Sequence, residues 1–291
     1  MAPIPAADVK KLRDQTGAGM MECKAALTEA NGNFEEANLI LRKRGLASAA
    51  KKAGRTTSEG LIGHRVSADH RSGILVEVNC ESDFVARTPD FQQLLEDVIT
   101  EIERAGGAAN DNWRSDPNGP IQKRVAAGIA KLGENMAVRR FVRFAGQGPA
   151  SYIGHYLHLG GKIGVLVELS GVDPQLAGRK GFVTLVKEIA MQIAAASPSY
   201  VARAEVPADI LDREKSIYRA QMEGQGKPAH VIDTIVEGKL ESFYSQVVLP
   251  DQASIRDTKT KVADVLAAAA TTLGATVSVT RFARLKVGDA Q

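Results

Sequence analysis

The cysteine and histidine residues of this chain could hold a metal ion or act as nucleophiles, but their spacing supports neither role. Cys23 and Cys80 are the only cysteines, and they lie far apart and outside any CxxC or Cys/His cluster. A zinc site and a disulfide framework are therefore not expected, and both thiols are expected to be reduced and structural. The sequence also lacks a GxxxxGKS/T phosphate loop, a GxSxG elbow and an HExxH pair. We expect no bound metal, no cofactor and no enzymatic activity.

Two histidines recur at equivalent places in an internal repeat, whereas a third does not. His64 and His155 occupy the same position in the two copies described below, and a residue repeated in this way is more often architectural than catalytic. His158 has Ser67 as its counterpart. This difference makes His158 a candidate binding residue, with an exposed turn histidine of no special role as the alternative.

Two glycine-rich stretches resemble nucleotide-binding loops only in composition. "TGAGMM" (16–21) joins two expected helices rather than following a strand, so it lacks the context of a nucleotide-binding fingerprint. "HLGGKIG" (158–164) falls where a β-hairpin must turn, and Gly160-Gly161 suits the positive φ of such a turn. Met20 and Met21 cannot both face the core of a small bundle. One of them is expected to be exposed, either as an adaptable protein contact or as a tolerated surface residue.

The most unusual local feature is Phe84 in "CESDFVAR", which follows the apolar run "GILVEV". Ser82 can N-cap a single helical turn, and Thr88-Pro89 ends that turn and starts the next helix with proline in its first position. Phe84 and Val85 lie about 100° apart around a helical turn, so one can face the core and the other the solvent. An exposed aromatic side chain on a rigid corner would serve as an anchor in a partner's pocket.

Composition and charge favour a cytoplasmic protein that binds neither membranes nor nucleic acid directly. The net charge is only +3, with basic and acidic residues interspersed, whereas nucleic-acid binding usually needs a broad basic face with aromatic residues. The main basic cluster, Arg42-Lys43-Arg44, is expected at a helix end, where it would compensate the helix dipole. No stretch approaches 18 consecutive apolar residues, and residues 1–17 lack the features of a secretory signal.

Residues 1–45 are expected to form three short helices, over 7–15, 21–30 and 34–45. Asn33 is a good N-cap for the third helix, and Gly45 is expected to end it. So small a bundle resembles a ubiquitin-associated type of three-helix module, which would suit protein binding. Residues 46–60, rich in small and basic residues, are expected to be a linker whose first part can continue helically. The expected core of the module is Leu12, Ala26, Leu27, Phe34, Ala37, Leu39 and Leu41.

The rest of the chain contains an internal repeat. "IGHRVSADHRSGILVEV" (62–78) matches "IGHYLHLGGKIGVLVEL" (153–169) without a gap, at an offset of 91. A second match, of "AAGIAKLGENMAVRRFVRF" (126–144) with "AAAATTLGATVSVTRFARL" (267–285), has an offset of 141. Between these matches the offset of 91 continues through two sets of apolar residues with helical spacing: Phe91, Leu94, Val98 and Ile102 in the first copy, and Phe182, Leu185, Ile189 and Ile193 in the second.

The predicted fold class is therefore α+β, with the three-helix N-terminal module followed by a duplicated β-β-α-α-β core. The first copy is expected over 61–146 and the second over 147–291. The difference between the offsets, 141 minus 91, gives the second copy an insertion of 50 residues. Two apolar stripes on either side of "GQGKP" (224–228) predict an antiparallel helical hairpin over 208–246. Its apolar face needs cover from its own hairpin partner or from another molecule, and a homodimer is one such arrangement.

The repeat also separates Phe84 from Val85. At the offset of 91, Val85 corresponds to Leu176, so Val85 is expected in the core. Phe84 corresponds to Gln175, whereas a core position shared by both copies would carry an apolar residue in the second copy. The comparison favours Phe84 as an exposed anchor over a core role specific to the first copy.

Four stretches of the chain resemble the bacterial elongation factor Ts family: "VKKLRDQTGAGMMECKAALTEANGNFEEA", "VNCESDFVAR", "GENMAVRR" and "HLGGKIGVLVEL". The resemblance covers essentially the whole chain. It implies a translation elongation factor that is the guanine-nucleotide exchange factor of the GTPase elongation factor Tu. Such a factor binds the GDP-bound GTPase, displaces Mg²⁺ and promotes GDP release so that GTP can bind. An RNA-binding protein would need a continuous basic face, and a small-molecule enzyme a recognisable set of convergent polar groups.

The resemblance also implies which residues contact the GTPase. In the family, the N-terminal module and first core subdomain contact the nucleotide domain, and the second subdomain reaches the third domain. The Asp-Phe pair, here Asp83 and Phe84 between Ser82 and Val85, approaches the magnesium and phosphate region, where the phenylalanine wedges between GTPase side chains. Family members commonly carry Thr where Ser82 stands, and Ser can also cap. The other contact residues implied are His158 in the second subdomain and, in the N-terminal module, Arg13, Thr16, Gly17, Met20, Met21 and Lys24.

Overall fold

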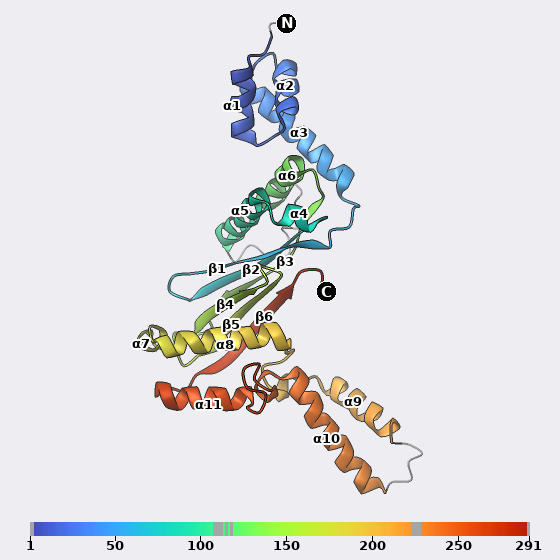
Figure 1. The fold of residues 1–291 in the computed structure, drawn as a ribbon, viewed down its shortest axis with the longest axis vertical. Helices are drawn as coiled ribbons and strands as arrows, with labels where there is room; N and C mark the ends of the chain where they lie inside the picture. Colours follow the sequence, from blue (N-terminus) through green and yellow to red (C-terminus); the bar gives the residue numbers. More distant parts are fainter. Residues whose placement is uncertain (1–2, 107–112, 114–115, 117–118, 223–227, 290–291) are drawn as a thin grey trace.

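The computed structural model describes residues 3–289 except 107–112, 114–115, 117–118 and 223–227, and it has an α+β architecture. Two three-stranded antiparallel sheets lie at the centre of an elongated molecule (Figure 1). A bundle of three helices, drawn in blue, occupies one end, and a helical hairpin, drawn in orange, projects at the other. The sheets pack face to face over a shared apolar cluster, and helices cover their outer faces. No helix within the described parts of the chain is long and apolar enough to cross a membrane.

The N-terminal bundle is built from helices α1 (Ala6–Thr16), α2 (Met20–Glu29) and α3 (Phe34–Lys52). Asn33 caps α3, since its side-chain oxygen accepts hydrogen bonds from the backbone N–H groups of Glu35 and Glu36 at 2.9 and 3.2 Å. Leu39 was predicted in the core but is exposed. The side of α3 that faces the core carries Ala37 and Leu41 instead. The buried residues of the bundle are Val9, Leu12, Cys23, Ala26, Leu27, Ala30, Ala37 and Leu41, with Phe34 partly buried at the edge.

Helix α3 does not end at Gly45, and this part of the prediction was wrong. Gly45 does not have the positive φ that is typical of a glycine at a helix end. Gly45 instead lies inside α3 where this helix packs on helix α6 (Pro120–Leu132), and a Cβ there would meet that of Ala130 at 3.4 Å. Residues 46–52 continue the helix, so the basic cluster Arg42-Lys43-Arg44 lies within α3 rather than at its end. That cluster therefore does not compensate the dipole at the helix terminus.

The first sheet has the strand order β1-β2-β3, and three helices follow its second strand. Strand β2 is buried along almost its whole length, because helices cover one face and the second sheet covers the other. The pairing of β2 with β3 shifts register between Glu77 and Val78. The elements are β1 (Glu59–Val66), β2 (Ser72–Cys80), α4 (Asp83–Ala86), α5 (Pro89–Ala105), α6 (Pro120–Leu132) and β3 (Met136–Ala145).

The second sheet has the equivalent order, β4-β5-β6. Its register shift, between Glu168 and Leu169, comes 91 residues after that of the first sheet. The eight apolar positions predicted on two helices are all buried, in α5 and α8. The elements are β4 (Tyr152–His158), β5 (Ile163–Ser170), α7 (Pro174–Ala177), α8 (Lys180–Ala196), α11 (Val262–Leu273) and β6 (Ser278–Lys286).

Matching contacts join the two sheets. His64 and His155 stack with ring centroids 3.9 Å apart, which agrees with an architectural role for these repeated histidines. Glu77 is fully buried and pairs with Arg140 at 2.8 Å, and Glu168 is fully buried and pairs with Arg281 at 2.6 Å. Each arginine also donates to a backbone carbonyl of the other half, at 3.1 and 2.7 Å. Each buried carboxylate thus has a cationic partner, as burial of a charge requires.

The hairpin consists of helices α9 (Ala208–Ala220) and α10 (Ala229–Val247), in the range where the sequence predicts it (Figure 1). Short 3-10 helices, η3 (Arg203–Glu205) and η4 (Leu249–Asp251), flank it. Arg203 ties its base together through ion pairs with Glu241 and Asp251 at 2.7 and 2.6 Å. The predicted turn at 224–228 lies, apart from Pro228, outside the described residues.

Candidate functional site

Helix α4 presents Phe84 to solvent at the end of the first sheet. The side chain is 81% exposed, so it fills no core position. Val85 packs against the edge of the core, and Ala86 is buried in it. Phe84 and Val85 point in different directions because successive residues of a helix are about 100° apart around its axis. An aromatic ring exposed to this degree is available to fill a pocket on another protein.

The turn that carries Phe84 is fixed at both ends by side-chain caps. The Ser82 hydroxyl accepts a hydrogen bond from the backbone N–H of Val85 at 3.4 Å. The Thr88 hydroxyl donates to the carbonyl of Val85 at 2.8 Å and accepts from the N–H of Phe91 at 3.2 Å. Pro89 begins α5, where its missing N–H would have had no helical partner. The direction of Phe84 is therefore set by local chemistry that the sequence already displays.

The equivalent turn of the second half, α7, carries no aromatic side chain. Asp173 caps it by accepting a hydrogen bond from the N–H of Leu176 at 2.7 Å. Leu176 is buried, and Gln175 is exposed. The inward position is thus apolar in both halves, whereas the outward position is aromatic only in the first. The fold of the turn does not require a phenylalanine.

Asp83, the acidic neighbour of Phe84, is paired with a side chain one turn later. Its Oδ2 accepts a hydrogen bond from Nη2 of Arg87 at 2.7 Å. Arg87 is well exposed and Asp83 partly so, and this pair therefore contributes at most about 1 kcal/mol. Asp83 can therefore exchange Arg87 for a group on another molecule without unfolding the turn.

Cys80 lies beneath the same corner and supports it. The thiol is fully buried and donates to the carbonyl of Ser82 at 3.1 Å. Burial raises the pKa of the Cys80 thiol to about 12, so the group stays protonated and is a poor nucleophile. Within the described parts of the chain, no group of three or more His, Cys, Asp or Glu side chains is placed to hold a metal ion.

Four of the predicted contact residues of the N-terminal module are exposed. Met20 and Met21 are 48% and 75% exposed, so the expected exposure of one of them extends to both. Met20 lies on the same side of α2 as the buried Cys23 but one turn nearer the helix start, beyond the edge of the small core. Arg13 and Lys24 are exposed as well. The start of α2 therefore offers adaptable apolar contacts with basic side chains nearby.

The other two predicted residues of this module, Thr16 and Gly17, lie where the bundle meets α6. The Thr16 hydroxyl donates to the carbonyl of Leu12 at 2.7 Å. Gly17 ends α1 with φ of 69°, and a Cβ there would lie 3.2 Å from the Lys131 side chain. Lys131 in turn pairs with Asp90, in the first turn of α5, at 2.8 Å. These contacts connect the loop between α1 and α2 to the corner that carries Phe84.

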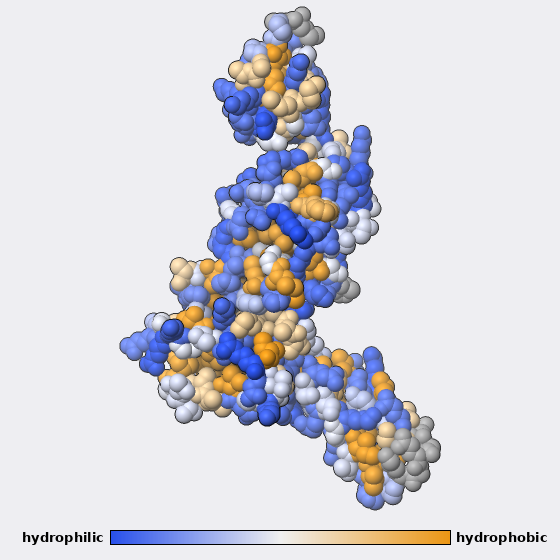
Figure 2. Space-filling model, in the orientation of Figure 1, coloured by the Kyte–Doolittle hydropathy of each residue, from blue (hydrophilic) through white to orange (hydrophobic). Residues whose placement is uncertain are grey.

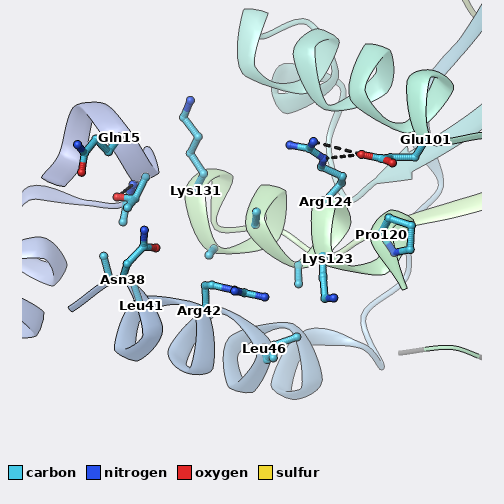
Figure 3. Close-up of a pocket in the computed structure, with 16 residues that line it drawn as sticks. Gln15, Asn38, Leu41, Arg42, Leu46, Glu101, Pro120, Lys123, Arg124 and Lys131 are labelled. Atoms are coloured by element: carbon cyan, nitrogen blue, oxygen red, sulfur yellow. Dashed lines mark hydrogen bonds and ion pairs between the residues drawn. The ribbon is translucent and has the colours of Figure 1, made fainter. Parts of the chain in front are cut away.

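A groove of about 450 Å³ lies along the junction between the bundle and α6 (Figure 3). Its floor is formed by small residues of α3 and α6, and basic side chains from both helices extend along it. Gln15 and Asn38 lie at one end, and Pro120 at the other (Figure 3). Thr16 lines this groove, so it faces an internal junction rather than open surface.

His158 is exposed at the end of β4, beside the turn into β5. Its Nδ1 lies 3.0 Å from Oη of Tyr156, within hydrogen-bonding distance. Leu159 follows it, 70% exposed and with φ of 50°, a conformation that residues with a branched side chain seldom adopt. Leu159 is a candidate that sequence reasoning missed. The available signal was an apolar residue directly before the two turn glycines.

The turn between β4 and β5 lies at the same end of the sheets as Phe84. Lys162, just beyond this turn, pairs with Glu59 at 2.6 Å. Glu59 is the register partner of Cys80, which ends β2 immediately before the α4 corner. The structure thus brings His158 and Phe84 to one end of the paired sheets, although the sequence separates them widely.

Comparison with known proteins gives one consistent result. The family model described as "Elongation factor TS" matches residues 81–289. Three similar proteins, each called elongation factor Ts, cover nearly the whole chain. That of Trichlorobacter lovleyi is 40% identical over 98% of this chain and 93% of its own length, and that of Nitratiruptor sp. is 42% identical over the same shares. That of Aquifex aeolicus is 41% identical over 97% of both.

Proposed function

This chain belongs to the elongation factor Ts family, and from that premise we propose that it is the guanine-nucleotide exchange factor of elongation factor Tu. It binds the GDP-bound GTPase, displaces Mg²⁺ and promotes GDP release so that GTP can bind. The observation that carries this proposal is Phe84, a ring 81% exposed on a turn capped at both ends. The factor acts in the cytoplasm, without direct contact with nucleic acid or a membrane.

Exchange of this kind needs no catalytic group, so the factor is not an enzyme. It binds the nucleotide-free GTPase more tightly than the GDP-bound form, and by linkage it weakens nucleotide binding by the same factor. Mg²⁺ is the largest local positive charge at the phosphates, so its displacement weakens the hold on GDP. A buried aromatic anchor supplies ~2 kcal/mol or more, which is at least about tenfold in affinity.

Asp83 and Phe84 take the central roles on this surface. Phe84 wedges between side chains of the GTPase beside the magnesium site, and its exposure in the free factor leaves it ready to do so. Asp83 can leave Arg87 at small cost and perturb the groups that hold Mg²⁺. Ser82 and Val85 fix the turn from either side, one as its cap and the other through its core contact.

The N-terminal module binds the nucleotide domain of the GTPase through the start of α2. Met20 and Met21 supply the apolar contact, and Arg13 and Lys24 flank it. Thr16 and Gly17 act indirectly, by shaping the loop that leads into α2. We assign this module, residues 1–45, to the ubiquitin-associated type because three short helices surround one thin core. The linker, 46–60, begins with the last turns of α3.

The second subdomain contributes His158, and we add Leu159 to this contact. We further propose that the core arose by duplication, with one copy over 61–146 and the other over 147–291. The equal strand orders and the matching buried ion pairs support this origin. The hairpin is proposed as a contact for a second copy of the chain, since Ile217 is exposed on it. Light scattering over a concentration series, with Ile217→Ser as the variant, tests that contact.

The decisive experiment is GDP release from elongation factor Tu with and without this protein. Elongation factor Tu is loaded with fluorescent GDP and mixed in a stopped-flow instrument with excess unlabelled GDP. The proposed function requires that the release rate rises with the concentration of the factor and that added Mg²⁺ opposes the effect. An unchanged release rate would refute it.

A further inference from the structure

Three distant segments of the chain meet beneath Phe84. The first is the end of β2 with the cap of α4, the second is the loop between α6 and β3, and the third is the linker after α3. They are held together by Glu134 and Asn135 on the loop, Glu81 beside the cap, and Arg55 on the linker. Asn135 is buried, Glu81 and Glu134 are partly buried, and only Arg55 of the four is exposed. Their contacts therefore act on the turn that carries the anchor.

Glu134 holds the cap of α4 with both carboxylate oxygens. Its Oε1 accepts the Ser82 hydroxyl proton at 2.6 Å, and its Oε2 accepts the Ser82 backbone N–H at 3.0 Å. With its proton directed to Glu134, the Ser82 hydroxyl is oriented to accept from the N–H of Val85. Hydrogen bonds to a charged group are stronger than neutral ones. Glu134 thus fixes the residue that starts the turn.

A reciprocal pair of contacts attaches the linker to the same place. Glu81 accepts the backbone N–H of Asn135 at 2.6 Å and lies 3.4 Å from Nη1 of Arg55. The Asn135 side chain is buried and donates to the carbonyl of Arg55 at 2.7 Å. Each of the three segments is thereby bonded to the other two. The linker from the N-terminal module cannot shift here without disturbing the corner.

The second half lacks this arrangement. At the offset of 141, Glu134 corresponds to Ala275, and at the offset of 91, Glu81 corresponds to Val172. Helix α7 nevertheless forms in the second half, capped by Asp173 alone. A one-turn helix at this place therefore does not need the carboxylate frame in order to fold. The frame occurs only in the half that carries the exposed phenylalanine.

We propose that Glu134 is a positioning residue for nucleotide exchange, which keeps the Ser82 cap and hence Phe84 in the orientation that enters the GTPase. This inference rests on the proposed exchange function. Without the carboxylate, the turn still forms, but the Ser82 cap is held less firmly and Phe84 is in the productive orientation for a smaller fraction of the time. The fraction of bound complexes in which Phe84 engages the GTPase falls accordingly, and the maximal exchange rate falls with it. Contacts made by Met20 and Met21 remain, so initial binding to the GTPase is retained.

The test compares Glu134→Ala and Glu134→Gln with the wild-type protein in labelled-GDP release from elongation factor Tu. Loss of two hydrogen bonds to a carboxylate should lower the maximal rate by about tenfold or more, while the half-saturating concentration changes by less than about twofold. Glu134→Gln keeps one acceptor oxygen and should recover part of the rate. Glu188→Ala is the matched control. Glu188, on α8, is also a partly buried carboxylate and pairs with Arg256, and the variant should exchange normally.

Two further measurements separate positioning from a general loss of structure. Amide hydrogen exchange at Ser82 and Val85 should accelerate in Glu134→Ala, while that of strand β2 stays protected. In the background of Phe84→Ala, Glu134→Ala should have no further effect on exchange, because the two changes act through one side chain. A wild-type protein that fails to accelerate GDP release refutes the proposed function. An active wild type with an equally active Glu134→Ala, or additive effects of the two changes, overturns the positioning role.

Discussion

Phe84 and Val85 occupy neighbouring positions but serve different purposes. Val85 contacts the core, as does its counterpart Leu176, and both anchor a one-turn helix to its sheet. Phe84 loses little solvent contact when the chain folds, so it contributes little to the free energy of unfolding. A large ring kept in water at 81% exposure leaves Phe84 available for the anchor role that we propose.

Phe84→Ala should therefore fold normally and lose most of its exchange activity. We expect the free energy of unfolding to change by less than about 0.5 kcal/mol and GDP release to slow by at least about tenfold. Urea denaturation and stopped-flow release provide the two measurements. Phe91→Ala, which removes a fully buried ring from α5, is the contrasting control and should cost about 3–5 kcal/mol. A stable but fully active Phe84→Ala protein would contradict the anchor role.

The stacked histidines should make the protein less stable in mild acid. Burial lowers the pKa of His155 to about 4, helped by the charges of His64 and His70, and burial also lowers the pKa of His64. The ordinary value is about 6.5, so at these two side chains the unfolded chain binds more protons than the folded one as the pH falls from 6.5 toward 4. The stabilisation is complete above pH 6.5 and declines as the pH falls toward 4.

Urea denaturation at a series of pH values checks this expectation. The double variant His64→Gln with His155→Gln should flatten the decline between pH 6.5 and 4. His230→Gln, at an exposed position on α10, should leave the decline unchanged. If the double variant keeps the wild-type pH profile, the histidine pair is not its cause.

Among the elements, α3 depends on a neighbour that its own sequence does not reveal. A glycine after basic residues is typical of a helix end, yet Gly45 lies inside α3, at its contact with α6. The helix therefore runs on to Lys52 and carries the bundle away from the sheets. Local patterns predicted the start of α3 correctly because a cap is a local feature. They misplaced its end because the packing partner lies far away in the sequence.

Gly45→Ala distinguishes the two roles of this glycine by the sign of its effect. Within a helix, and with only an ordinary contact to Ala130, the change should raise stability by about 0.5–1 kcal/mol. Gly133→Ala is the control, because Gly133 ends α6 with φ of 80°, and it should lower stability by about 1 kcal/mol. Thermal or urea unfolding gives both values. A destabilised Gly45→Ala would show that the approach to α6 leaves no room for a methyl group.

On the scale of the whole molecule, the two halves are joined by equivalent buried charges. Arg140→Met leaves the Glu77 carboxylate buried without its cation and should cost about 3–5 kcal/mol, and Arg281→Met should do the same to Glu168. Arg219→Met removes an exposed pair with Asp233 and should cost less than about 1 kcal/mol. Urea denaturation measures all three. A cost below 1 kcal/mol for both buried pairs would mean that water or another donor replaces the arginines.

Much of the fold could be predicted because the sequence contains two gapless matches. The offset of 91 aligned strands and helices whose apolar residues are indeed buried, and the comparison of Phe84 with Gln175 indicated which side chain faces outward. Contacts between distant segments could not be predicted in this way. Glu134 is placed under the corner by β3, and Leu159 is placed beside the first sheet by the pairing of β4 with β5. The spacing of residues along a chain does not predict contacts between segments that are distant in sequence.

The buried carboxylate of Glu77 has a consequence for the order in which the protein can be completed. Glu77 accepts the backbone N–H of Gly288 at 3.2 Å, across 211 residues, and its partner Arg140 donates to the carbonyl of Lys286. During synthesis from the N-terminus, the first sheet emerges from the ribosome long before either group exists. Until the last strand is synthesised, the Glu77 carboxylate lacks the hydrogen bond from Gly288, and Arg140 lacks its acceptor on Lys286. A product released before residue 286 should therefore be digested faster by proteases at its first sheet as well as at its cut end.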